Sequence, residues 1–101
     1  MAGIVWSEPA LADLESIADW VALYSPSAAV ALVRRVFAHV DQLADHPDSG
    51  GWMPELRDTG YRQIVEPPCR VFYRRDGNRV LIVHVMRSER DLHRQWREGG
   101  F

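Results

Sequence analysis

Lysine is absent from this sequence, and all twelve basic residues are arginines. Cysteine is almost absent too, because Cys69 stands alone; one cysteine excludes an internal disulfide and favours a reducing compartment. No apolar run approaches the ~20 residues that a membrane span needs, and the first residues lack the basic segment and apolar core of a signal peptide. We therefore expect a cytoplasmic protein without membrane contact.

The remaining composition is that of an ordinary globular domain. The chain has 101 residues, of which 47% are hydrophobic and 26% charged, so we expect residues 1–101 to form a single domain around one core. Charge is unevenly distributed: residues 1–56 hold two arginines against eight acids, and residues 57–101 hold ten arginines against six acids. This polarity is expected to orient a charged partner.

Three β-rich runs separated by turn residues occupy the stretch from Tyr61 to Arg87. They cover residues 61–66, 69–75 and 80–87. Pro67-Pro68 cannot donate the hydrogen bonds of a strand ladder, so this pair must lie outside the strands. Three runs with such short connections predict a small antiparallel sheet.

Asp76-Gly77 is the strongest hairpin signal in the sequence. If these two residues form the loop, the register pairs Tyr73 with Val80, Val71 with Ile82 and Arg70 with Val83. One face then carries Cys69, Val71, Tyr73, Val80, Ile82, His84 and Met86, and the other carries Phe72, Leu81, Val83 and Val85 with Arg70, Arg74 and Arg87 around them. Both faces are largely apolar, so we expect each to be covered.

Two amphipathic helices are predicted ahead of the sheet. The apolar run from Gly3 to Trp6 reads as an edge strand, and Ser7 is an N-cap for a helix over residues 8–23. The segment Ser25-Pro26-Ser27 ends that helix and caps a second one, over about residues 27–44. The apolar stripe expected on the second helix is Val30, Val33, Phe37, Val40 and Ala44. We expect the two helices to form a hairpin on one sheet face.

After the strands, Ser88-Glu89-Arg90-Asp91 is a capping-box pattern that predicts a short C-terminal helix. Residues 47–54 are expected to be a loop. The predicted order is therefore β-α-α-β-β-β-α, an α+β fold in which the final helix is left to cover the second face of the sheet.

Five segments, in this order and spacing, resemble the RelE/ParE superfamily of bacterial toxins. They are Ile4–Ser7, Ala10–Ile17, Pro54–Leu56, Cys69–Arg74 and Val83–Asp91. The resemblance implies a small growth-inhibiting toxin of a type II toxin-antitoxin module, of the kind linked to plasmid stabilisation. It also implies a cognate antitoxin that wraps and silences the toxin in a hetero-oligomer.

The superfamily is divided by activity. RelE-like members cut messenger RNA in the ribosome, whereas ParE-like members poison DNA gyrase. Glu55 and Arg70 match a general base and an arginine of one nuclease branch, and a carboxylate with a cation suits cleavage beside a 2′-hydroxyl. The alternative is structural: Glu55 belongs to a turn, and Arg70 pairs with an acid such as Glu66.

The end of the last strand favours the ParE-like reading. The nuclease branch has a histidine and a tyrosine there, but this chain has Arg87 to Arg90, and arginine cannot give up a proton near neutral pH. Alternation puts His84 on the face opposite Arg87, as a packed or hydrogen-bonded residue. The net charge of −2 is also unlike that of a protein that binds ribosomal RNA.

We therefore expect a ParE-like gyrase inhibitor with no favoured catalytic residue. One alternative is a RelE-like ribosome-dependent endoribonuclease that uses Glu55, Arg70 and Arg87; a weaker one is a non-toxic remnant that still binds antitoxin. The residues expected to meet the antitoxin or the target are Arg62, Arg70, Arg74, Arg87, Arg90 and Trp96.

The remaining chemistry-bearing residues are expected to be structural. Trp6 and Trp20 read as core, Trp52 as exposed and Cys69 as buried. The histidines show no metal-ligand spacing with Cys69, and no phosphate-binding glycine loop is present, so we expect neither a metal nor a cofactor.

Overall fold

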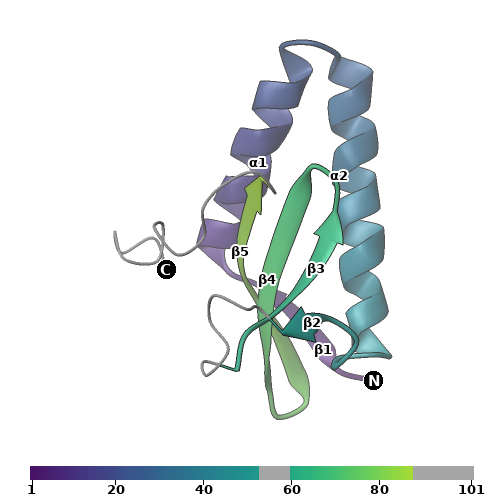
Figure 1. Cartoon of the computed structure of the whole chain (residues 1–101), viewed down its shortest axis with the longest axis vertical. Helices are drawn as coiled ribbons and strands as arrows, with labels where there is room; N and C mark the ends of the chain where they lie inside the picture. Colours follow the sequence, from purple (N-terminus) through teal and green to yellow (C-terminus); the bar gives the residue numbers. More distant parts are fainter. Residues whose placement is uncertain (53–59, 88–101) are drawn as a thin grey trace.

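A computed structural model describes residues 1–52 and 60–87 of the chain. In this part, two helices pack on a five-stranded sheet whose strand order is β1-β5-β4-β3-β2 (Figure 1). The elements are β1 (Gly3–Trp6), α1 (Glu8–Ala22), α2 (Pro26–Asp41) with a 3-10 turn (Gln42–Ala44), β2 (Gly51–Trp52), β3 (Arg62–Glu66), β4 (Cys69–Asp76) and β5 (Arg79–Arg87). The predicted α+β fold, a helical hairpin on a sheet, is confirmed.

Both helices begin where the sequence predicts. The Ser7 side chain accepts a hydrogen bond of 3.1 Å from the N–H of Ala10, and the Ser25 side chain accepts one of 3.2 Å from the N–H of Ala28. Each cap is followed by a proline in the first turn, where the missing N–H costs nothing. Local capping chemistry thus fixes the residue at which each helix begins.

The sheet is mixed: the three predicted strands are antiparallel, as expected, and a further strand at one edge is parallel. β1 is the predicted edge strand, but it pairs with β5 in parallel, from Gly3 opposite Arg79 to Trp6 opposite Ile82. A parallel pair needs a long crossover, which the chain between these strands supplies. At the other edge, Gly51 and Trp52 form β2 where a loop was predicted.

The β4–β5 hairpin loop lies one residue later in the chain than predicted, so the partner of Tyr73 on β5 is Ile82 instead of Val80, a register shift of two residues. The loop is Gly77-Asn78, and Asp76 pairs with Arg79. Gly77 has a φ of +59°, and glycine at the first loop position is what a type II′ turn requires. The glycine therefore leads the loop instead of ending it.

A β-bulge on β5 changes which side chains reach the core. Tyr73 pairs with Ile82, but its neighbour Phe72 pairs with His84, so Val83 is an extra residue. Alternation on β5 reverses beyond this point, and Val85 enters the core in place of His84. The predicted faces of β4 are correct, whereas those of the last four residues of β5 are inverted.

One core lies between the hairpin and the sheet. Its fully buried side chains include Tyr73, Leu32, Leu43, Ile82, Val36, Val40, Val71, Val80 and Cys69. On α2 the buried stripe is Ala29, Leu32, Val36 and Val40, and the predicted Val30 is 52% exposed. Apolar residues on several sides of α2 made its buried face ambiguous. No helix in the described residues is long and apolar enough to cross a membrane.

Candidate functional site

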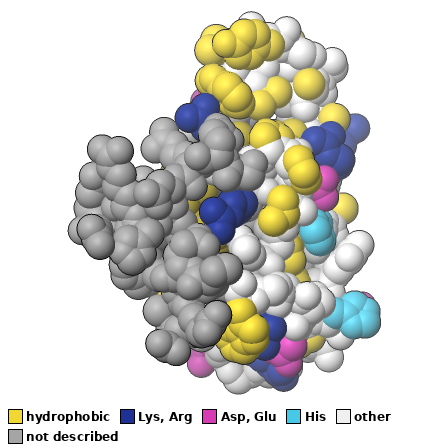
Figure 2. Space-filling view, viewed as in Figure 1, with side chains coloured by type: hydrophobic (Ala, Val, Ile, Leu, Met, Phe, Trp, Pro, Cys, Tyr) yellow, Lys and Arg dark blue, Asp and Glu magenta, His cyan; other side chains and the backbone are white. Residues whose placement is uncertain are grey.

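The sheet face turned away from the helices carries Arg70 and Arg74 on β4. Both alternate with the core residues Cys69, Val71 and Tyr73, so their side chains leave on the opposite face. The guanidinium of Arg70 lies 5.2 Å from the ring centre of Phe72, and its Nε donates a 2.8 Å hydrogen bond to Gln63. Figure 2 shows basic and hydrophobic side chains side by side on the surface.

Glu66, the predicted partner of Arg70, is engaged elsewhere. It pairs with Cys69 across the β3–β4 ladder, which places its side chain toward the helices. Its carboxylate lies 3.4 Å from Arg35 Nε and 3.3 Å from His39 Nδ1, both on α2. The contact ties α2 to β3, and it removes Glu66 from the face of Arg70.

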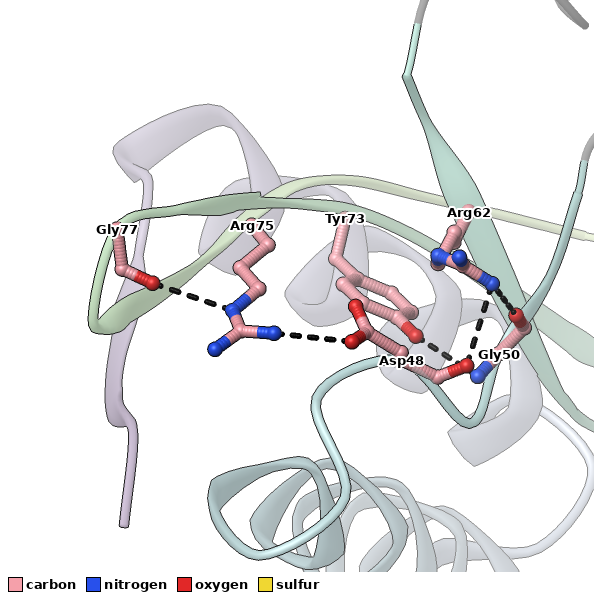
Figure 3. Close-up of polar contacts among 6 residues, drawn as sticks. All are labelled: Asp48, Gly50, Arg62, Tyr73, Arg75 and Gly77. Carbon is pink, nitrogen blue, oxygen red and sulfur yellow. Dashed lines mark hydrogen bonds and ion pairs between the residues drawn. The ribbon is translucent and has the colours of Figure 1, made fainter.

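Arg62 serves the fold of its own chain. Its guanidinium stacks 3.9 Å from the ring centre of Trp52 and donates hydrogen bonds to the backbone oxygens of Asp48, at 3.2 Å, and Gly50, at 2.8 Å (Figure 3). Its ladder partner is the core residue Tyr73, so Arg62 lies on the helix side of the sheet. The prediction that Arg62 and Arg70 share one surface is wrong.

Tyr73 holds the same loop from inside. Its hydroxyl oxygen accepts a 2.8 Å hydrogen bond from the N–H of Gly50, and both residues are buried. Burial raises the pKa of the Tyr73 hydroxyl above 10.0, although the Gly50 hydrogen bond and nearby Arg62 oppose the rise. Beside it, Arg75 contacts the Asp48 carboxylate at 2.9 Å (Figure 3). Loop 45–50 is therefore fixed to β3 and β4.

Arg87 lies over α1, away from Arg70 and Arg74. It pairs with Cys69 across the ladder, and its guanidinium is 4.6 Å from the ring centre of Trp20. Arg87 and Trp20, together with Asp13, line a pocket of about 400 Å³ between α1 and β5. Trp20 was expected in the core but is 40% exposed, because it faces this pocket.

Large hydrophobic side chains are exposed where the hairpin turns from α1 to α2. Leu23 is 79% and Tyr24 81% exposed, and the Tyr24 ring meets Trp20 edge-on at 6.2 Å. Figure 2 shows hydrophobic side chains gathered over this end of the molecule. Aromatic residues beside an arginine are typical of protein-protein contact sites, so this end is a second candidate surface.

His84 is tied to α1 through Asp13. The Nδ1 of His84 lies 2.8 Å from Asp13 Oδ2, and the N–H of Val85 donates a 3.1 Å hydrogen bond to the same oxygen. A carboxylate only accepts, so Nδ1 carries the proton. The contact joins residues 71 positions apart in the chain, and no local sequence signal points to Asp13.

The structure brings together only part of the predicted site. Arg70 and Arg74 share a face, Arg62 lies on the other, and Arg87 lies at the Trp20 pocket. Glu55, Arg90, Trp96 and the predicted C-terminal helix fall outside the described residues. Cys69 is buried, as expected, Trp52 is 55% exposed, as expected, and no cluster of metal-ligating side chains occurs in residues 1–52 and 60–87.

Comparison with known proteins identifies the family. Residues 4–92 match the family described as the ParE toxin of the type II toxin-antitoxin system parDE. The protein Toxin RelE2 of Caulobacter vibrioides is 36% identical over 89 residues, which cover 86% of this chain and 92% of that protein. A structure of the chromosomal ParDE toxin-antitoxin system from P. aeruginosa has a TM-score of 0.72 and 28% identity, over 86% of this chain and 96% of that one. The chain is therefore a toxin of a type II toxin-antitoxin system, and it belongs to the ParE toxin family within the RelE/ParE superfamily.

Proposed function

We propose that this toxin inhibits DNA gyrase and that a cognate antitoxin silences it. The observation that carries the proposal is the match of residues 4–92 to the ParE toxin family, because the ParE-like branch of the superfamily poisons gyrase. The toxin then acts by binding, and it needs no catalytic group of its own.

The charge of the chain supports a protein target. The net charge is −2, and α1 carries four acids, Glu8, Asp13, Glu15 and Asp19, without any basic residue. Affinity for RNA comes largely from the neutralisation of phosphates by basic side chains. The acidic helix beside the Arg87 pocket repels phosphates, so it disfavours binding to ribosomal RNA. Trp20 on this helix and Tyr24 just beyond its end are in contact with solvent, where they can anchor a protein surface.

Supercoiling by purified gyrase, followed with and without the toxin, tests the proposal. We expect loss of supercoiling and accumulation of cleaved DNA. The Glu55→Ala variant should stay toxic, and truncation before Arg90, which removes Trp96, should abolish toxicity. Normal supercoiling at every toxin concentration would overturn the proposal.

A ribosome-dependent endoribonuclease is the second candidate, and the β5 bulge is the observation that favours it. The bulge moves His84 to the sheet face of Arg70, where the sequence did not place it. The hydrogen bond from Nδ1 to Asp13 also orients the imidazole. A cation for the phosphate and a histidine for proton transfer therefore share a face, as general acid-base cleavage requires.

Translating ribosomes separate the two candidates. A gyrase inhibitor leaves messenger RNA intact. Its Arg70→Ala and His84→Ala variants, where they are folded, should still inhibit gyrase. Codon-register cuts that disappear in both variants, with gyrase unaffected, would instead establish the nuclease. The exposed Arg79→Ala variant, in the hairpin far from His84 on the strand, controls for a general loss of charge.

We propose the Arg70–Arg74 face as the antitoxin surface. These two arginines share one face of β4, and the half-exposed Val65 on β3 and the partly exposed Leu81 on β5 flank them there. An antitoxin segment with acidic and apolar side chains fits this face, because charges steer the encounter and apolar contacts hold it.

A further inference from the structure

An open groove separates α1 and α2 on the helical side of the molecule. It encloses about 430 Å³, and small side chains line it on both helices: Ala18 and Ala22 from α1, and Ala29 from α2. Val30 also lines it and is 52% exposed. Short side chains allow another helix to approach closely, and the exposed valine supplies apolar surface.

The two sides of the groove carry opposite charges. Asp19 lies on α1 and Arg34 on α2, and both line the groove and are exposed. Neither belongs to an ion pair among residues 1–52 and 60–87. The groove therefore presents one acid and one base, each available to a partner.

We infer that this groove binds a second copy of the chain, so that two helical hairpins pair about a two-fold axis. A partner with charges of one sign would be attracted by one side of the groove and repelled by the other. A second copy, rotated about the axis, brings its own Asp19 to Arg34 and its own Arg34 to Asp19. Such self-complementarity is what an isologous interface needs, and the product is a four-helix arrangement.

This pairing goes beyond gyrase inhibition and antitoxin binding. It uses the helical side of the molecule and leaves the far face of the sheet uncovered, with the partly exposed Arg70 and the exposed Arg74. Two toxins can therefore pair while each sheet face stays accessible, which would give a complex with two toxin copies at its centre.

Single charge reversals test the pairing. Analytical ultracentrifugation of the purified 101-residue chain should show a monomer-dimer equilibrium. Asp19→Arg alone, or Arg34→Asp alone, should weaken the dimer by about tenfold or more, because like charges then meet twice across the axis. Glu15→Arg makes the same charge change one turn earlier on α1, outside the groove, and should leave the dimer intact. Unchanged far-ultraviolet circular dichroism shows that each variant is folded.

Mixing the two single variants gives the sharper result. Each is repelled by its own copy, but the Asp19→Arg chain complements the Arg34→Asp chain at both contacts, so the mixture should form a heterodimer. The double variant Asp19→Arg/Arg34→Asp should regain self-association. A wild-type chain that stays monomeric at all concentrations, or single variants that do not pair when mixed, would overturn the inference. So would variants that lose antitoxin affinity while self-association is unchanged, since the groove would then belong to the antitoxin.

Discussion

The phenolic oxygen of Tyr73 accepts the N–H of Gly50, and these two buried residues leave no space for a side chain between them. A Cβ at position 50 would lie 2.6 Å from Tyr73 Cε1 and 2.7 Å from the backbone oxygen of Gln63. Glycine is needed here for its size, because its φ is not positive. The loop before β2 is therefore attached to the sheet at one point that tolerates no added atom.

Replacing that glycine should destabilise the toxin. Gly50→Ala forces the loop away from Tyr73 and should lower the free energy of unfolding by about 1–3 kcal/mol, the usual cost of overpacking. Gly51→Ala is the matched control, because a Cβ there meets nothing within 4 Å. Urea denaturation of both variants measures the difference; equal midpoints would contradict the close packing at Gly50.

Removing the Tyr73 hydroxyl should also be costly. Tyr73→Phe leaves the buried N–H of Gly50 without its acceptor, which should lower the free energy of unfolding by about 1–3 kcal/mol. Tyr24→Phe, at a ring that is 81% exposed, should change stability little. Thermal or urea unfolding of the two variants provides the comparison, and similar losses would argue against the hydrogen bond as the cause.

The raised pKa of Tyr73 should make the protein less stable at alkaline pH. Its hydroxyl holds its proton above pH 10.0 in the folded state, whereas in the unfolded chain it ionises near its ordinary value. The folded state then binds more protons, so stability is fully present below about pH 10 and falls as pH rises further. Urea midpoints across this range should decline more steeply for wild type than for Tyr73→Phe. Parallel declines would contradict the burial of the ionising group.

Local signals explain what the sequence could predict. The caps at Ser7 and Ser25, the two helices and the three β-rich runs follow from residues that act on their immediate neighbours. The hairpin register could not be predicted in this way, because Gly77 can be either the first or the second residue of a two-residue loop. Nor could the bulge at Val83, since an apolar run looks the same with or without an extra residue.

The candidate site was harder to predict because it depends on those details. The extra residue at Val83 exchanged the predicted faces of His84 and Arg87. The contact of His84 with Asp13 spans 71 positions, and it arises where α1 packs beside the part of β5 that extends beyond its pairing with β1. Counting arginines located a basic half of the chain, but it could not separate Arg62, which holds a loop, from Arg70.

Asp13 should therefore contribute more to the free energy of unfolding than an ordinary surface acid does. Its carboxylate accepts hydrogen bonds from the Val85 N–H and from His84, so Asp13→Ala removes the acceptor of two partly buried hydrogen bonds. We expect a loss of about 2 kcal/mol in the free energy of unfolding. Asp13→Asn keeps one acceptor and should lose less. Glu15→Ala, an exposed acid on the same helix, should be nearly neutral in the same urea titrations; a loss as large as that of Asp13→Ala would mean that the edge contact is unimportant.

Reversing a charge on the proposed antitoxin surface should weaken the antitoxin complex, whereas reversing one elsewhere should not. Arg74 is exposed on the face away from the helices, so Arg74→Glu should repel an acidic antitoxin segment and raise the Kd by about tenfold or more. The salt dependence of the remaining affinity should become shallower, because fewer favourable charge contacts are left to screen. Arg34→Glu makes the same charge change on the helical side; because it also weakens the proposed self-pairing, its Kd for antitoxin is compared at concentrations where the wild-type toxin is monomeric, and there it should be unchanged. Isothermal titration at several salt concentrations measures both quantities, and an equal effect of the two variants would show that the antitoxin responds to net charge and has no preference for the sheet face.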